Sequence, residues 1–132
     1  MIQPLAYIHP QAIIAENVVI EPFVTIYKDV VIGEGTWIGS NVTIMEGARI
    51  GKNCRIFPGA VISAPPQDLK YKGEPSTVTI GDNTIIRECV TLNRGTALDK
   101  NTTAIGNNCL IMPFTRMPNQ PVAVLPAGAK MP

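Results

Sequence analysis

Isoleucine recurs at every sixth position through the first half of the chain. A period of six matches neither the 3.6-residue turn of an α-helix nor the two-residue alternation of a hairpin strand. It is typical of hexapeptide solenoids, in which each repeat is one small structural unit and stacked repeats bury a continuous core. The series is Ile8, Ile14, Ile20, Ile26, Ile32, Ile38, Ile44, Ile50, Ile56 and Ile62.

Each repeat has a second regular position, four residues after the isoleucine. Its residues are mostly small or β-branched, which suits an extended backbone with little internal space. Between the two positions lie Gly, Asn and Asp, which tolerate the left-handed backbone of sharp corners. We therefore predict one short strand and one corner per repeat, with three repeats closing a triangular coil. The second positions hold Ala12, Val18, Val24, Val30, Thr36, Val42, Ala48, Cys54 and Ala60.

The repeat also predicts how the coils stack. Neighbouring coils should pair as parallel strands roughly 4.7–4.9 Å apart, and each fully buried isoleucine should contribute roughly 1.5–3 kcal/mol. A coil cannot bury its own isoleucines, so stability is close to a sum of nearest-neighbour terms. Three columns are expected: Ile8, Ile26, Ile44 and Ile62; Ile14, Ile32 and Ile50; Ile20, Ile38 and Ile56.

The repeat is interrupted twice. It fails from Ser63 to Thr79, where three prolines and a glycine exclude a regular sheet strand. Ile62 and Ile80 are 18 residues apart, which allows either one degraded coil or one repeat carrying a loop of about 12 residues. The change in composition favours a loop projecting near residues 63–79, and such insertions often form the binding face of a solenoid. A second interruption runs from Ala97 to Ala104.

Length and charge exclude several classes of protein. The 132 residues indicate a single domain. The formal net charge of +1 argues against a polyanion-binding face, so we expect no nucleic-acid partner. No run of 18 apolar residues exists, so no membrane span is expected. The opening segment, positions 1–15, lacks the basic and apolar regions of a secretory signal.

The residues that commonly bind metals are few and dispersed. We expect Cys54, Cys89 and Cys109 to be small buried thiols in a reducing compartment rather than a disulfide or metal set. The single histidine, His9, lies beside Pro10 in the first repeat, where we expect a structural or surface role. We therefore predict no metal site within a subunit and no cofactor.

Two segments resemble one known family. Residues 66–75 contain Gln67-Asp68-Leu69-Lys70-Tyr71, and residues 86–96 contain Leu92-Asn93-Arg94-Gly95-Thr96. In this order inside a hexapeptide solenoid, they closely resemble the UDP-N-acetylglucosamine O-acyltransferases of lipid A biosynthesis. The opening residues 1–10 look like the amino terminus of that family, and the resemblance covers residues 1 to about 112.

The resemblance implies a fold, an activity and a set of partners. Hexapeptide solenoids of this kind form left-handed parallel β-helices, so the implied fold class is all-β. The implied reaction moves a 3-hydroxyacyl group from acyl carrier protein to the 3-hydroxyl of UDP-N-acetylglucosamine, as the first step of lipid A synthesis. The implied enzyme is a cytoplasmic homotrimer with its active sites in clefts between neighbouring subunits.

The resemblance also implies which residues bind substrate. Gln67, Asp68 and Lys70 correspond to substrate-contacting residues of the projecting loop. A carboxylate can accept a hydrogen bond from a sugar or acyl-chain hydroxyl, and a lysine offers a cation to anionic groups. Asn93 stands where many family members carry histidine, so we assign it a polar contact only. Arg94 precedes a glycine corner and is expected to face the cleft between subunits.

Other arginines and charged residues have simpler explanations. Arg87 follows a core isoleucine and is expected to face outward, where an ion pair with Glu88 or another neighbour is the ordinary structural role. A solvated loop is likewise the ordinary explanation for the charges of residues 63–79. The Gln67-Asp68-Leu69-Lys70-Tyr71 motif is what favours a functional role for that loop.

The catalytic base of the family is missing. The resemblance implies a histidine some ten to fifteen residues after Ile105, and this chain has none there. Residues 113–132 contain several prolines and no repeat, so we expect the β-helix to occupy residues 1–112 and an irregular proline-rich tail to follow. The family's later coils and helical domain are not found. We therefore expect a truncated or frame-shifted product that is inactive by itself.

Two other functions remain open at this stage. The first is a non-catalytic module that binds a sugar nucleotide or serves as a scaffold. The second is an acyltransferase that uses acetyl-coenzyme A, although those enzymes also need a histidine base. The β-helical carbonic anhydrases need several metal-binding histidines, which the single His9 does not provide.

Overall fold

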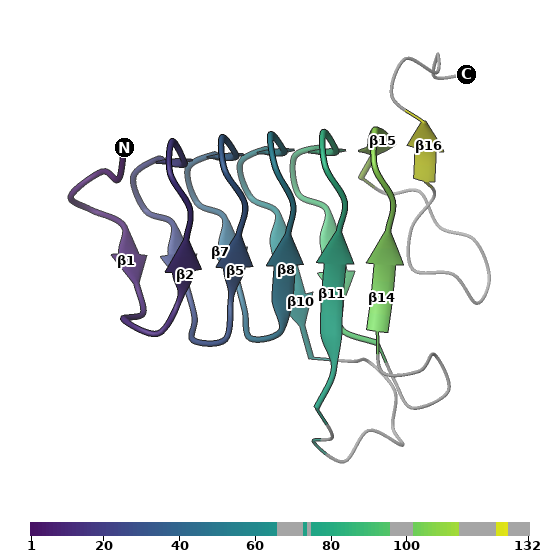
Figure 1. Ribbon diagram of the computed structural model, residues 1–132, viewed down its shortest axis with the longest axis horizontal. Helices are drawn as coiled ribbons and strands as arrows, with labels where there is room; N and C mark the ends of the chain where they lie inside the picture. Colours follow the sequence, from purple (N-terminus) through teal and green to yellow (C-terminus); the bar gives the residue numbers. More distant parts are fainter. Residues whose placement is uncertain (66–72, 74, 96–101, 114–123, 127–132) are drawn as a thin grey trace.

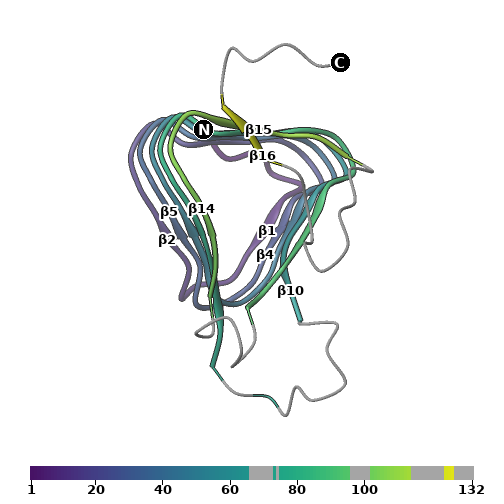
Figure 2. The same ribbon diagram turned by 90° about the vertical axis from the view of Figure 1, so that its right-hand side faces the viewer.

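The chain winds around three faces of a triangular prism. The structure is a computed structural model and describes residues 1–65, 73, 75–95, 102–113 and 124–126. Within these residues every regular element is a β-strand (Figure 1). Seen from its carboxyl-terminal end in Figure 2, the chain turns clockwise as it approaches the viewer. The fold is therefore a left-handed parallel β-helix, as predicted.

Successive strands belong to successive faces, so every third strand lies in the same sheet. The first sheet contains β1 (Tyr7–Ile8), β4 (Thr25–Ile26), β7 (Thr43–Ile44), β10 (Val61–Ala64) and β13 (Thr91–Asn93). The second sheet contains β2 (Ile13–Ile14), β5 (Val31–Ile32), β8 (Ala48–Ile50), β11 (Thr77–Ile80) and β14 (Thr102–Ile105). The third sheet contains β3 (Val19–Ile20), β6 (Trp37–Ile38), β9 (Arg55–Ile56), β12 (Ile85–Ile86), β15 (Cys109–Ile111) and β16 (Val124–Pro126).

Strand β16 pairs differently from the other strands. It runs antiparallel to β15, with Leu110 opposite Leu125, whereas the other strand pairs of the described chain are parallel. It therefore adds a reversed strand to the third sheet beyond the last parallel coil. No helix in the described part of the chain is long and apolar enough to cross a membrane.

The strand register confirms the three predicted isoleucine columns. The first sheet aligns Ile8, Ile26, Ile44 and Ile62, and the same column continues to Leu92. The second sheet aligns Ile14, Ile32 and Ile50, and the third aligns Ile20, Ile38 and Ile56.

Both interruptions leave these columns intact. Ile50 pairs with Ile80 instead of with position 68, so the first interruption lengthens its coil by the equivalent of two repeats. Ile80 pairs with Ile105 instead of with position 98, so the second lengthens the next coil by one repeat and a further residue. The first interruption is therefore one repeat carrying an inserted loop, and the alternative of a degraded coil is wrong.

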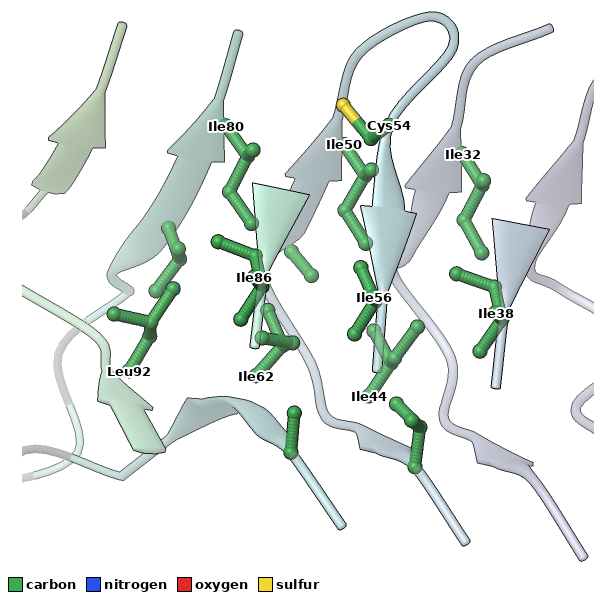
Figure 3. Packing of buried hydrophobic residues seen from close by; sticks show 14 of the residues in the cluster. Ile32, Ile38, Ile44, Ile50, Cys54, Ile56, Ile62, Ile80, Ile86 and Leu92 are labelled. Carbon is green, nitrogen blue, oxygen red and sulfur yellow. The ribbon is translucent and has the colours of Figure 1, made fainter. Parts of the chain in front are cut away.

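The columns form one continuous core. The isoleucines from Ile20 to Ile62 are almost completely buried. Figure 3 shows the side chains of this series from Ile32 onward pointing into the prism. The residues four positions after each isoleucine are buried as well from Val18 to Ala60. Ile8 and Ile14 are only half buried, because the first coil has a neighbour on one side alone. At the amino-terminal end, burial therefore depends on the neighbouring coil, as the nearest-neighbour argument predicts.

A ladder of hydroxyl and thiol groups also runs through one corner of the core. The hydroxyl of Thr36 donates to the carbonyl of Gly51 at 2.8 Å and accepts from the amide of Cys54 at 3.1 Å. The thiol of Cys54 donates to the carbonyl of Gly81 at 3.0 Å, and the hydroxyl of Thr84 continues the series in the following coil. Each rung therefore satisfies a polar group of the next coil inside an otherwise apolar interior.

The corners explain one wrong expectation about the cysteines. The third residue after an inward aliphatic residue usually has a positive φ and is mostly Asn, Asp or Gly. Cys89 occupies such a corner, with φ of 61°, and is exposed, because the core position belongs to Val90. Cys109 is half buried in the last parallel coil, and only Cys54 is fully buried. The prediction of three buried thiols is therefore correct for Cys54 alone.

The packing of the core predicts that alanine substitution at two isoleucines will change stability by very different amounts. We expect Ile38→Ala to lower the free energy of unfolding by about 2–5 kcal/mol, because it opens a cavity between neighbouring coils. Ile13→Ala should change it by less than about 0.5 kcal/mol, because Ile13 is 64% exposed. Urea unfolding followed by circular dichroism measures both. Equal losses for the two variants would contradict the assignment of inward and outward positions.

The cysteines should react with a thiol reagent in a fixed order. Burial raises the pKa of the Cys54 thiol, and the nearby charge of Asp82 raises it further. The reactive thiolate is therefore scarce at Cys54 near neutral pH. We expect Cys89 to be labelled first, Cys109 more slowly, and Cys54 only after unfolding, as read by mass spectrometry. Cys89→Ser should abolish the fast phase, and rapid labelling of Cys54 in the folded protein would contradict this order.

Candidate functional site

The two interruptions both lie at the same corner of the prism, in adjacent coils. The first lies between β10 and β11 and the second between β13 and β14, so each joins the first sheet to the second. Their ends lie side by side, since Ala64 pairs with Asn93 and Thr77 pairs with Thr102. The hydroxyl of Thr77 donates to that of Thr102 at 2.9 Å. We call this region, from the ends of β10 and β13 to the starts of β11 and β14, the open corner.

A β-bulge marks the beginning of the open corner. The register of β10 and β13 shifts between Ile62 and Ala64, so Ser63 has no partner on β13. Ser63 has a φ of 67°, is buried, and donates its hydroxyl hydrogen to the carbonyl oxygen of Glu46. Bulges re-aim the residues that follow them and are frequent beside active sites. Here the bulge sets the direction in which the chain leaves the coil.

The side chain of Arg94 reaches back under this bulge. It is half buried, and its Nη1 donates to the carbonyl oxygen of Glu46 at 3.1 Å. The same carbonyl accepts the hydroxyl of Ser63. The backbone amide of Arg94 donates to the carbonyl of Ala64 at 2.8 Å. Arg94 thus contacts both the bulge and the strand that carries it.

Three buried polar atoms at the open corner lack a hydrogen-bond partner. Among the described side chains, the buried atoms without a partner are the Ser76 hydroxyl oxygen, Asn93 Oδ1 and Arg94 Nε. An unpartnered buried polar group is costly, and it calls for a specific explanation in a native protein. Together they offer an amide acceptor, a guanidinium donor and a hydroxyl that can do either. That set is suited to a ligand rich in hydroxyl and amide groups, such as a sugar.

Gly47 is a point of close approach between these segments. A Cβ atom at Gly47 would collide with the carbonyl oxygen of Ser76, and it would lie 3.3 Å from Arg94 Cδ and 3.4 Å from Ser63 Oγ. Its φ of 91° also favours glycine. The open corner is therefore packed around a position that admits no side chain.

The residues predicted for the site differ in what the structure says of them. Gln67, Asp68 and Lys70 lie outside the described residues. Asn93 and Arg94 lie together at the open corner, both half buried. Sequence reasoning misses Ser63, Ser76 and Gly47, although Ser63 stands where the repeat first fails. That break is the one signal available, because the spacing does not show which side chains turn inward where the repeat is interrupted.

Arg87 lies away from the open corner, on the third sheet. It forms the expected ion pair with Glu88, with 2.9 Å between Nε and Oε1, and its guanidinium lies 4.2 Å from the ring of Phe57. Both contacts are at the surface, and they confirm the ordinary structural role that was predicted for Arg87.

His9 is distant from this site. Strand β1, which precedes it, lies four strand spacings from β13, or about 19 Å. Its Nδ1 accepts the backbone amide of Gln11 at 3.0 Å. The described residues include no group of three or more His, Cys, Asp or Glu placed to hold a metal ion.

Two glycines with similar positive φ angles allow the cost of a steric clash to be separated from the cost of an unfavourable backbone conformation. Gly73 has a φ of 86°, and a Cβ there would meet none of the described atoms within 4 Å, whereas one at Gly47 meets the Ser76 carbonyl. We expect Gly73→Ala to cost about 1–2 kcal/mol of unfolding free energy, and Gly47→Ala about 1–3 kcal/mol more. Thermal and urea unfolding measure the difference. Equal costs would contradict the close packing described at the open corner.

Comparison with known proteins identifies relatives of the same repeat architecture. Residues 29–64 match the bacterial transferase hexapeptide family (six repeats). The chain is 45% identical over 116 residues to the acyl-[acyl-carrier-protein]–UDP-N-acetylglucosamine O-acyltransferase of Chlamydia caviae, covering 88% of this chain and 41% of that relative. The chain thus spans about two fifths of the length of the curated relative it matches.

Solved structures agree with this result. The UDP-N-acetylglucosamine acyltransferase of Bacteroides fragilis is 62% identical with a TM-score of 0.83, and the match covers 85% of this chain and 44% of that one. A perosamine N-acetyltransferase of Caulobacter crescentus is 16% identical with a TM-score of 0.62 over 93% of this chain and 54% of that one, so it shares the fold alone. The chain is thus a hexapeptide-repeat protein that matches the amino-terminal part of the UDP-N-acetylglucosamine O-acyltransferases, as its two motifs predicted.

Proposed function

We propose that this chain forms the amino-terminal β-helix of an enzyme that transfers a 3-hydroxyacyl group from acyl carrier protein to the 3-hydroxyl of UDP-N-acetylglucosamine. That reaction is the first step of lipid A synthesis. The observation that carries the proposal is the identity of 62% to a solved UDP-N-acetylglucosamine acyltransferase over 85% of this chain. The position of the open corner supports it, because the motif-bearing insertion begins and ends there.

The open corner and the inserted segment each contribute residues to substrate binding. Asp68 and Gln67 accept and donate hydrogen bonds to sugar or acyl-chain hydroxyls, and Lys70 supplies a cation to an anionic group such as the diphosphate. Asn93 offers its unpartnered Oδ1 as an acceptor for a substrate hydroxyl or amide. Arg94 lies next to Asn93, and its bonds to the carbonyls of Glu46 and Ala64 hold the backbone that carries Asn93.

The chemical step requires a base that this sequence does not provide at the site. The sugar oxygen attacks the thioester carbonyl, a C–O bond forms, the C–S bond breaks, and the carrier thiol leaves with a proton. A positioned histidine typically accelerates such a step by about 10²–10⁴-fold. The single histidine of the 132 residues is His9, about 19 Å from β13. We therefore propose that residues 1–132 bind substrate but do not turn it over.

The assembly we propose is a homotrimer in the cytoplasm. The open corner lies on the outside of the prism, where a neighbouring subunit can complete it (Figure 2). An active site formed between subunits would give the unpartnered polar atoms of this corner a second wall. Acyl carrier protein is the proposed acyl donor, in keeping with the name of the curated relative.

A second candidate is a non-catalytic module that binds a sugar nucleotide or serves as a scaffold. The observation that favours it is the absence of any histidine near the open corner in a sequence whose sole histidine is His9. It shares the binding surface with the first candidate and differs in having no acyl-transfer step in any longer form of the protein.

Binding of the nucleotide sugar tests the shared part of both candidates. We expect calorimetry with UDP-N-acetylglucosamine to show binding, and Asp68→Ala to weaken it by about tenfold or more, since a hydrogen bond to a charged group contributes about 1.5–3 kcal/mol. Glu34→Ala is the matched control, because Glu34 is an exposed carboxylate at a different corner. It should leave the affinity unchanged.

Two negative results of the calorimetry would have different meanings. No heat with the unaltered chain would contradict sugar-nucleotide binding, whereas equal affinity with and without Asp68→Ala would remove that carboxylate from the site. The same samples mixed with 3-hydroxyacyl carrier protein should form no product. Rapid product formation would show that a base exists within residues 1–132.

A further inference from the structure

One guanidinium joins three consecutive coils beneath the open corner. Glu46 follows β7, Ser63 forms the bulge of β10, and Arg94 follows β13, so the three residues come from neighbouring strands of the first sheet. The Glu46 carbonyl accepts both the Ser63 hydroxyl and Arg94 Nη1, the latter at 3.1 Å. A single backbone oxygen is thereby shared by the coil below and the two coils that carry the interruptions.

The backbone beside Arg94 reaches the ends of both interruptions. The Arg94 amide donates to the carbonyl of Ala64, where the first interruption starts, and the Gly95 amide donates to the carbonyl of Thr77, where it ends. The Asn93 carbonyl accepts the hydroxyl of Thr103, beside the end of the second interruption, at 2.8 Å. Residues 93–95 therefore connect all the described strand ends that border the open corner.

A second arginine shows what the same contact does where the chain is continuous. Nη1 of Arg49 donates to the carbonyl of Asp29 at 2.7 Å, and its Nη2 pairs with the Asp29 carboxylate at 2.6 Å. Asp29 occupies the corner equivalent to Gly47 one coil earlier, and no interruption begins there. Arg49 holds its corner with the help of an ion pair. The ion pairs found among the described residues do not include Arg94.

We propose that Arg94 is a positioning residue for the open corner. Its guanidinium and the Ser63 hydroxyl both donate to the Glu46 carbonyl and so fix the bulge at residues 63–65, while the amides of residues 94 and 95 hold the strand ends at Ala64 and Thr77. Arg94 thereby acts on ligand binding through the backbone around it, without contacting the ligand. The identity of the ligand rests on the proposed function, whereas the positioning role rests on the contacts of Arg94 alone.

The contacts show which backbone hydrogen bonds should weaken when the Arg94 side chain is removed. The amide of Val78 donates to the carbonyl of Gly47 at 3.0 Å, directly beside the Arg94 side chain. The amides of residue 94 and Gly95 donate to Ala64 and Thr77. These three amides report the closure of the corner, because each must open before its hydrogen exchanges.

We expect Arg94→Ala to raise hydrogen exchange at these three amides by about tenfold or more, as measured by NMR well below the unfolding temperature. The affinity for UDP-N-acetylglucosamine should fall by about fivefold to tenfold. Arg94→Lys keeps one donor and should restore part of both effects. Arg49→Ala is the matched control, and it should change neither, even with a similar loss of thermal stability.

Two outcomes would overturn the proposal. The first is unchanged exchange at the three amides in folded Arg94→Ala. The second is faster exchange with unchanged affinity, which would reduce Arg94 to a stabilising residue. If Arg94→Ala does not fold, Ser63→Ala removes the other donor to the Glu46 carbonyl, and it is judged by the same measurements. If the unaltered chain binds no UDP-N-acetylglucosamine, the proposed function fails, while the exchange rates still decide whether Arg94 fixes the corner.

Discussion

The whole structure depends on one constraint: a triangular coil of short strands cannot bury its own inward side chains. Each strand is very short, so it gains little from its own hydrogen bonds and depends on the strands above and below it. The first coil shows this directly, since Ile8 and Ile14 remain half buried while Ile26 and Ile32, one coil later, are fully buried. Stacking therefore fixes the direction of every side chain in the prism.

The stacking is predictable from the sequence because it depends on spacing alone. The six-residue period assigns inward and outward positions correctly for the isoleucines, and it also returns after the first interruption, where Ile80 pairs with Ile50. The expectation for Cys89 is wrong although the phase of the repeat is unbroken there. The position four residues after Ile86 is Val90, which is buried, and Cys89 occupies the exposed corner one residue earlier.

The candidate site is predictable only in part, for a different reason. Its loop residues are identified through a motif, and the repeat says nothing about residues that depart from it. The bulge at Ser63 turns its side chain inward, and Arg94 reaches the carbonyl of Glu46, which lies far from it in the sequence. Contacts of that kind depend on which coils become neighbours. They follow only once the register is known.

The two insertions stand at the same corner and differ in length, and the register of the core is the same on either side of each. Only the first is a whole multiple of the repeat, so it is the neighbouring strand that restores the phase, and the number of intervening residues is free. Insertions of two different lengths are therefore accommodated here without disturbing the scaffold. The corner thus separates what differs from what is fixed, because the two insertions differ in length while the columns beneath them keep one register.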